Sequence, residues 1–255
     1  LGMGRSCAFL DDIEEDADHA TPYDRTDTSD ALRGMRPIPF YRTPVEDRAK
    51  GIGAAMGPAG SIDSCAADML KWVQFHLNHG AWEGKQLISE DSMQQMHRPN
   101  MILNAPLDMP MPETDFWSYG MGWFIESFRG HKLIQHGGNI NGFSGFTSFM
   151  PDLNLGVVAY TNMNGSYLHY ALGREIIDHY LGIEDGNWVQ RYHDFVAGRS
   201  ANAAKQILAM TGEQVPGTSP SHPMADYTGT FCREGYTPAV VTEENGTLYL
   251  DFINE

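Results

Sequence analysis

Residues 135–143 read Q-H-G-G-N-I-N-G-F, and they hold the most informative pattern of the chain. Two adjacent glycines inside a strand cost stability, and they usually mark a place where another backbone comes close. His136, the residue before them, can donate a hydrogen bond or change its charge near neutral pH. The pattern predicts a strand edge against which a peptide-like substrate lies. Taken alone, it also fits an ordinary Gly-rich hairpin turn with His136 merely exposed.

The residues on both sides of this stretch have the composition of short strands joined by tight turns. Strands are expected over residues 119–128, from 132 into the His136 segment, over 146–150 and over 155–161. The connections at 130–131 and 151–154 are too short for the crossovers that parallel strands need. The sequence therefore predicts an antiparallel meander.

Helices are expected before and after this meander. Ser64 is expected to cap a helix that runs to Asn78, and Ser89 to cap a shorter helix that Pro99 ends. Residues 167–181 predict an amphipathic helix ended by Gly182. One apolar stripe of that helix contains Leu168, Leu172, Ile176 and Tyr180. The strands should pack against the helices of residues 64–78 and 167–181, so the predicted fold class is α+β.

The remainder of the chain predicts a helical linker and the start of a second domain. Residues 187–211 have the pattern of one or two helices, and residues 212–224 have a linker composition. Strand-like runs follow, and Asn245-Gly246 is a strong hairpin signal between the last two. We therefore predict three segments, at residues 1–182, 183–222 and 223–255. The last is expected to be a small, truncated all-β domain.

The charge and the cysteines exclude several classes of function. The chain has 33 acidic and 17 basic residues and a formal net charge of −16, so binding to nucleic acid or to an anionic membrane surface is disfavoured. The sequence contains no run of about 18 apolar residues, so it predicts no membrane-spanning helix. The cysteines, Cys7, Cys65 and Cys232, show neither a disulfide framework nor the spacing of a zinc site. His76 and His79 are expected to be a solvent-facing pair rather than metal ligands.

Several short motifs follow one another in a recognisable order. They are Gly57-Pro58-Ala59-Gly60, the two capped helices, Tyr119-Gly120-Met121-Gly122-Trp123, His136-Gly137-Gly138, Gly142-Phe143, Pro151-Asp152, Thr161-Asn162 and the helix of residues 167–181. This ordered set resembles the second half of the serine β-lactamase/penicillin-binding-protein family, in its class C-like branch of esterases, D-aminopeptidases and DD-peptidases. Leu1-Gly2-Met3 resembles the "PLGM" segment of that branch, and the tail from Tyr227 resembles the small β domain often appended to such hydrolases.

The resemblance implies a partial β-lactamase/transpeptidase-like fold and hydrolysis of an amide or ester bond through a serine acyl-enzyme, without metal or cofactor. His136-Gly137-Gly138 is similar to the third motif of the family, K-T-G or H-x-G. By this resemblance, His136 is a catalytic hydrogen-bonding and electrostatic partner, and Gly137 and Gly138 are substrate-binding residues. The backbone N–H of Asn139 is the second catalytic group, as an oxyanion-hole donor. The resemblance also makes an exported or periplasmic location plausible for the parent protein.

The chain departs from the family at the nucleophile. No lysine has a serine three residues before it, so S-x-x-K is absent from these 255 residues. One Y-x-N occurs, at Tyr160-Thr161-Asn162, but it follows the third motif instead of preceding it, and Tyr160 is expected to be core or turn packing. Removing the nucleophile from a serine hydrolase costs on the order of a millionfold in rate. We therefore expect the C-terminal fragment of a hydrolase, inactive alone.

Two kinds of partner follow from these expectations. One is a small-molecule or peptide-like amide or ester substrate. The other is a separate N-terminal half of the same protein, which would carry the nucleophile. The alternative from another class is a non-catalytic binding or structural module that associates with that separate half.

Overall fold

The computed structural model describes residues 1–8, 16–25, 34–39, 57–104, 109–140, 142–211, 217–234 and 238–251. The chain forms two compact units, residues 1–41 with 55–202 and residues 42–54 with 203–255. The predicted segment boundaries at residues 182 and 222 stay a prediction.

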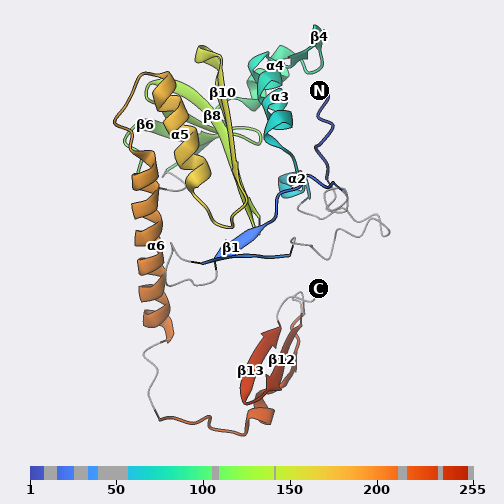
Figure 1. Ribbon diagram of the computed structural model, residues 1–255, viewed down its shortest axis with the longest axis vertical. Helices are drawn as coiled ribbons and strands as arrows, with labels where there is room; N and C mark the ends of the chain where they lie inside the picture. The colour runs from blue at the N-terminus through green and yellow to red at the C-terminus, as the bar shows by residue number, and fades with distance from the viewer. Residues whose placement is uncertain are drawn as a thin grey trace. The chain divides into compact units, whose positions relative to one another are not determined.

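Antiparallel strands form the six-stranded sheet of the first unit, and their order across the sheet is the reverse of their order in the chain (Figure 1). From one edge to the other they are β10 (Leu155–Thr161), β9 (Phe143–Met150), β8 (His131–Ile140), β7 (Phe124–Phe128), β6 (Thr114–Tyr119) and β5 (Met101–Leu103). The predicted meander is confirmed. The strand expected over residues 119–128 is present but shorter, because β7 begins at Phe124 and the residues between Tyr119, the end of β6, and Phe124 form the turn.

The helices that accompany the sheet largely match the predicted ones. They are the short α2 (Gly57–Gly60), α3 (Ala66–Leu77), α4 (Glu90–Met96), α5 (Leu168–Tyr180) and α6 (Trp188–Thr211), with 3-10 turns at Pro151–Leu153 and Met224–Tyr227. Ser89 caps α4 as predicted, since its hydroxyl accepts a hydrogen bond from the backbone N–H of Ser92 at 3.2 Å. The predicted cap at Ser64 is wrong by one residue, because Cys65 is the N-cap of α3. Short pairs, β1 (Tyr23–Arg25) with β2 (Met35–Pro37) and β3 (Ala81–Trp82) with β4 (Lys85–Gln86), complete the unit.

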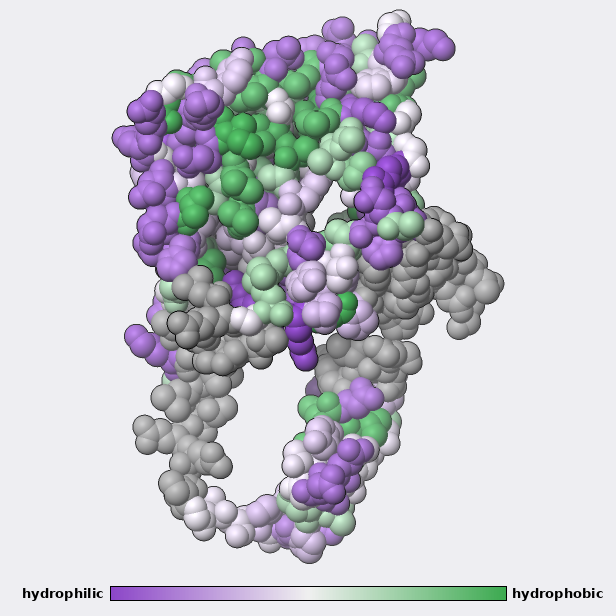
Figure 2. Space-filling view, in the orientation of Figure 1, coloured by the Kyte–Doolittle hydropathy of each residue, from purple (hydrophilic) through white to green (hydrophobic). Residues whose placement is uncertain are grey.

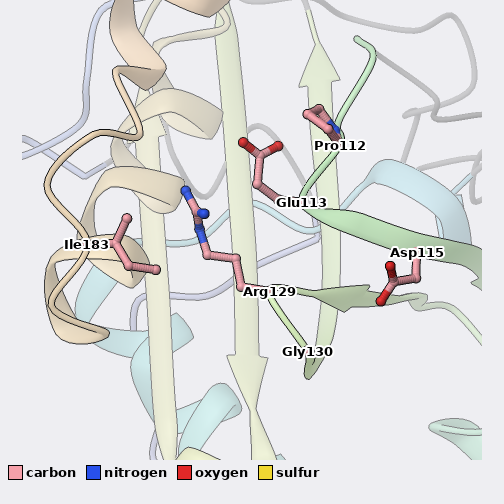
Figure 3. Close-up of a pocket in the computed structure, with 6 residues that line it drawn as sticks. All are labelled: Pro112, Glu113, Asp115, Arg129, Gly130 and Ile183. Atoms are coloured by element: carbon pink, nitrogen blue, oxygen red, sulfur yellow. The ribbon is translucent and has the colours of Figure 1, made fainter.

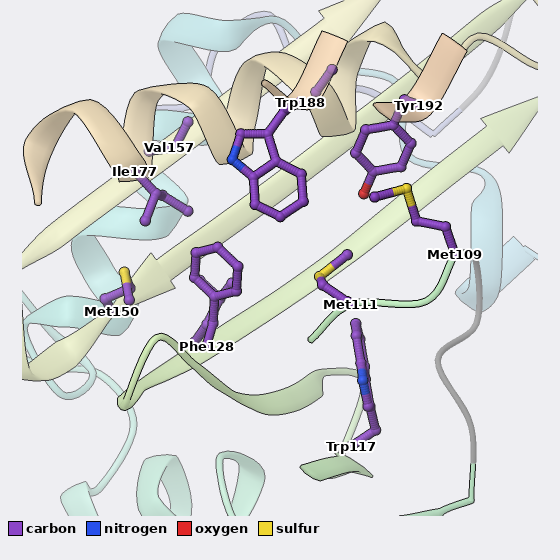
Figure 4. Close-up of a cluster of buried hydrophobic side chains, with 11 residues drawn as sticks. Met109, Met111, Trp117, Phe128, Met150, Val157, Ile177, Trp188 and Tyr192 are labelled. Atoms are coloured by element: carbon purple, nitrogen blue, oxygen red, sulfur yellow. The ribbon is translucent and has the colours of Figure 1, made fainter. Parts of the chain in front are cut away.

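Both faces of the sheet are covered, because successive side chains of a strand point to opposite faces. On β8, Leu133 joins a large apolar cluster with α5 and α6, and its neighbour Ile134 joins a second cluster with α3. Figure 4 shows the larger cluster, in which Trp188 of α6 lies over Phe128 with ring centroids 5.8 Å apart. The first half of β8 is therefore held by apolar packing on both faces of the sheet.

A buried ion pair fastens α5 to the sheet. Arg174 of α5 donates to the carboxylate of Glu126 on β7 at 2.6 Å, and both side chains are buried. The guanidinium also lies 4.4 Å from the centre of the Phe128 ring, which adds a cation–π contact. A second pair at the end of the helix joins Arg129 to Asp178 at 2.6 Å. These contacts set which face of α5 meets the sheet.

The helical pattern led us to expect that the apolar stripe of α5 faces the sheet. The stripe faces away from it. Leu168, Leu172, Ile176 and Tyr180 are between 41% and 59% exposed. The buried face carries Ala171 and Ile177 together with Arg174 and Asp178, and each of these two charged residues has an ion-pair partner inside the unit. Figure 2 shows hydrophobic side chains gathered over α5 and the neighbouring β10.

The second unit contains a small antiparallel sheet. Its strands are β11 (Gly229–Phe231), β12 (Ala239–Glu244) and β13 (Thr247–Asp251), in that order across the sheet. Asn245 and Gly246 join β12 to β13 with φ angles of 52° and 80°, and both values suit a type I′ hairpin. The predicted hairpin is confirmed. None of the helices in the described ranges combines the length and the apolar composition needed to cross a bilayer.

His76 is buried, which makes the predicted solvent-facing pair with His79 wrong. Its Nδ1 lies 2.9 Å from Nε2 of His97, which follows α4, and aromatic side chains from α3 and the sheet surround the two rings. Burial lowers the pKa of His76 to about 3 and that of His97 to about 4. Both rings are therefore neutral in the folded protein at neutral pH.

This pair makes the fold sensitive to acid. The unfolded chain protonates both rings near pH 6.5, whereas the folded chain does so only near pH 3 to 4, so the unfolded state binds more protons between these values. We expect the free energy of unfolding to fall by up to about 1.4 kcal/mol per pH unit for each ring as the pH drops below 6.5. Urea unfolding at pH 7.5, 6.5 and 5.5 measures the slope. The double variant His76→Phe with His97→Leu should flatten it, and the exposed His179→Gln should not; equal slopes in all three proteins would contradict the assignment.

Candidate active site

The end of β8 that carries the His-Gly-Gly segment is paired on one side only. The pairing of β7 with β8 ends at Phe124 opposite Gln135, whereas the pairing with β9 continues from His136 opposite Thr147 to Ile140. Among the described residues, no strand pairs with the other edge of residues 136–140. An unpaired edge presents backbone N–H and C=O groups, to which an extended peptide-like group can bind.

Two hydrogen bonds orient the His136 ring at this edge. Its Nδ1 lies 2.6 Å from the carbonyl oxygen of Gly137, and its Nε2 lies 3.1 Å from the hydroxyl of Tyr119, the last residue of β6. The ring of Phe124 packs against it at a centroid distance of 5.1 Å. Tyr119 is the partner that sequence reasoning missed. It belongs to the Tyr-Gly-Met-Gly-Trp motif, but nothing in the sequence indicates that this motif reaches His136.

The two glycines of the segment have different surroundings. A Cβ at Gly137 would clash with the hydroxyl of Tyr170, which reaches the strand from α5. A Cβ at Gly138 would meet no heavy atom within 4 Å. Close packing against α5 is therefore sufficient to require glycine at position 137, while the space beside Gly138 is open. Their substrate-binding role stays a prediction.

The side chain of Asn139 is engaged in holding the turn after β10. Its Oδ1 accepts hydrogen bonds from Ser144 and from the backbone N–H of Gly165, both at 2.7 Å, and its Nδ2 donates to Asn164 at 3.1 Å. A catalytic contribution from Asn139 would therefore come from its backbone N–H, as the resemblance implies, and not from its amide.

Tyr160 lies on the same face of the sheet as His136, two strands away. Its ring packs over Gly145, and its hydroxyl makes a 2.9 Å hydrogen bond with Thr147, the residue paired with His136. Burial raises the pKa of Tyr160 above its ordinary value, so the phenol stays protonated at neutral pH. Tyr160 is 40% exposed, so it packs on the surface of the sheet and not in the core, and its structural role stays a prediction.

A surface pocket elsewhere on the unit does not coincide with this site. It is lined by Pro112, Glu113, Asp115, Arg129, Gly130 and Ile183, at the β7–β8 turn and thus at the opposite end of β8 from His136 (Figure 3). Its principal charges are paired, Arg129 with Asp178 and Glu113 with Arg191 at 2.7 Å. We interpret these groups as structural.

Comparison with known proteins identifies the family. The sequence pattern of the Beta-lactamase family matches residues 1–180, and the chain belongs to this family. The chain is 30% identical over 214 residues to the unguisins hydrolase ungD of Aspergillus violaceofuscus, which covers 77% of the chain and 36% of that protein. It is 26% identical over 140 residues to the protein flp of Staphylococcus aureus, which covers 54% of the chain and 25% of that protein.

A solved structure is similar over part of its length. The penicillin-binding protein from Bacillus halodurans aligns with a TM-score of 0.46 and 18% identity, over 69% of this chain and 46% of that one. Among the relatives known by sequence, the chain matches about a third of the length of ungD and a quarter of that of flp.

The contrast between the two glycines can be measured. We expect Gly137→Ala to lower the free energy of unfolding by about 1–3 kcal/mol, because the added methyl group overpacks against Tyr170. Gly138→Ala should change it by no more than about 0.5 kcal/mol, because the methyl group enters open space. Urea denaturation of both variants tests this, and equal losses would contradict the packing described for Gly137.

Proposed function

We propose that this chain supplies the carbonyl-binding part of the active site of a serine hydrolase that cleaves amide or ester bonds through an acyl-enzyme. The observation that carries the proposal is the one-sided pairing of residues 136–140, with His136 held in place beside the free edge. Membership of the Beta-lactamase family supports the same chemistry, as does the name of its relative, a hydrolase of unguisins.

The free edge suits the binding of an acyl group in an extended conformation. Backbone groups alternate in direction along a strand, so those of residues 137 and 139 point to the same side of β8. In the proposed site, the N–H of Asn139 donates to the substrate carbonyl oxygen and stabilises the negative charge that develops on it. The open space beside Gly138 lets the substrate backbone come close to the strand.

The nucleophile has to come from outside these 255 residues, because they contain no S-x-x-K. In the proposed reaction, a serine oxygen bonds to the carbonyl carbon and the leaving amine or alcohol takes up a proton. Water then hydrolyses the resulting ester. DD-peptidase, D-aminopeptidase, esterase and β-lactamase activities all fit this scheme, since substrate choice depends on groups around the site.

Intact mass measures whether the chain reacts alone. After incubation with a penicillin, and separately with a fluorophosphonate, we expect no mass increase. A stoichiometric adduct would place a reactive serine within these residues and would overturn the assignment.

A mixing experiment tests the positive part of the proposal. A family polypeptide that carries S-x-x-K should acquire the adduct faster when this chain is added. Gly138→Val should remove that gain, because its side chain fills the space beside the strand edge, whereas Gly198→Val, on an exposed position of α6, should retain it. An equal gain with both variants would contradict a role for the β8 edge.

The surface of α5 and β10 supports a second part of the proposal, association with another polypeptide segment. The exposed stripe at Leu168, Leu172, Ile176 and Tyr180 runs the length of α5, and α5 contacts β10. β10 is an edge strand of the sheet among the described residues, and its sequence contains no charge and no proline. Soluble proteins usually protect such an edge. The same surface favours the second candidate function, a non-catalytic module that associates with a separate N-terminal half.

Self-association of the isolated chain tests whether the exposed surface of α5 and β10 binds another polypeptide segment. We expect the isolated chain to form oligomers at concentrations of tens of micromolar, and Leu172→Glu with Ile176→Glu to shift it toward monomer, because the charges disrupt an apolar contact. Sedimentation velocity gives the distribution. Glu175→Gln is the matched control on an exposed position of the same helix and should not dissociate the oligomers. A monodisperse wild-type monomer that melts cooperatively would contradict this part of the proposal.

A further inference from the structure

The hydrogen bonds of His136 define which of its nitrogens can exchange a proton. The carbonyl oxygen of Gly137 can only accept a hydrogen bond, so Nδ1, 2.6 Å away, must carry a hydrogen. This holds for the neutral ring and for the charged one. Nε2 is therefore the nitrogen at which His136 gains or loses a proton, and its partner is the hydroxyl of Tyr119, 3.1 Å away.

The hydroxyl of Tyr119 can serve both protonation states. It donates its hydrogen to Nε2 when His136 is neutral, and its oxygen accepts the N–H of Nε2 when His136 is charged. A backbone carbonyl could do only the second, and a backbone N–H only the first. The residue type at position 119 thus allows the ring to keep one orientation while its charge changes.

Tyr119 is held rigidly at the end of its strand. Its carbonyl accepts the N–H of Asn100 at 2.9 Å, and its ring packs edge-on against Phe124 at 4.6 Å. The next residue, Gly120, donates its N–H to the carbonyl of Trp123 at 2.8 Å and closes the β6–β7 turn. A Cβ at Gly120 would clash with the carbonyl oxygen of Met96, so only glycine fits there.

We propose that the Tyr119-Gly120-Met121-Gly122-Trp123 hairpin places Tyr119 as a positioning residue for His136: its hydroxyl is the partner of Nε2, the exchanging nitrogen, and holds the ring in one orientation at the strand edge. Tyr119 acts through His136 and needs no contact with the substrate. The catalytic consequence rests on the proposed function, because it matters to the reaction only if His136 faces the substrate.

Among the described residues, the groups in hydrogen-bond, ring or strand-pair contact with His136 are those already named. They are Tyr119 from β6, Phe124 from β7, the carbonyl of Gly137 on β8, and Thr147 on the paired position of β9. Tyr119 is the titratable side chain among them.

Nitrogen NMR of the histidine rings tests the proposal on the 255-residue chain without substrate. In protein labelled with ¹⁵N-histidine at about pH 8, we expect His136, assigned by its loss in His136→Gln, to show a protonated Nδ1 and an unprotonated Nε2. In Tyr119→Phe, Nδ1 keeps its hydrogen because the carbonyl of Gly137 is still present, but Nε2 loses its hydrogen-bond partner, so we expect the Nε2 signal to shift. Tyr160→Phe removes a tyrosine hydroxyl from the same sheet face, where it contacts Thr147, and should leave the His136 signals unchanged.

Two results would overturn the proposal. One is a wild-type ring with its hydrogen on Nε2, and the other is a His136 spectrum that is the same in Tyr119→Phe as in the wild type. Should Tyr119→Phe fail to fold, 3-fluorotyrosine at position 119 keeps the shape and makes the hydroxyl a stronger donor. It should then shift the Nε2 signal, and an unshifted signal counts against the proposal. The spectra require no turnover, so a failed acylation experiment removes the hydrolase proposal without changing their outcome.

Discussion

The ion pair between Glu126 and Arg174 is the contact on which the rest of the first unit depends. Both charges lie out of water, so neither can be tolerated without the other, and removing one partner of such a pair costs about 3–5 kcal/mol. The pair sets the rotation of α5 against the sheet. With α5 in that rotation, Tyr170 lies beneath Gly137, and the packing reaches the strand that carries His136.

The same packing explains how a strand edge can be open and ordered at once. β8 is held from its two faces by apolar clusters and on one side by β9, while β7 ends before His136. Apart from the Gly137 carbonyl, which His136 binds, the backbone groups on the free side of residues 136–140 therefore need no rearrangement to meet a ligand. Pre-organised donors of this kind stabilise developing charge without a reorganisation cost, which is what oxyanion binding requires.

The exposed stripe of α5 shows why a periodic pattern does not identify the buried face of a helix. Helical spacing places Leu168, Leu172 and Ile176 on one line, and that line faces away from the sheet. The buried face contains two charged residues, which are stable there because each has a partner from a distant part of the chain. A pattern of apolar residues cannot reveal such partners, since it records only local order.

Local chemistry by itself determined the antiparallel meander, the strand Leu155–Thr161, the cap at Ser89 and the Asn245-Gly246 hairpin, because turns, caps and short connections act between neighbouring residues. The ordered motifs also pointed to the family. Only the tertiary structure decided that His76 pairs with His97 and that Tyr119 meets His136. These contacts join residues 17 to 21 positions apart across strands and helices, so their geometry arises only when the sheet is assembled.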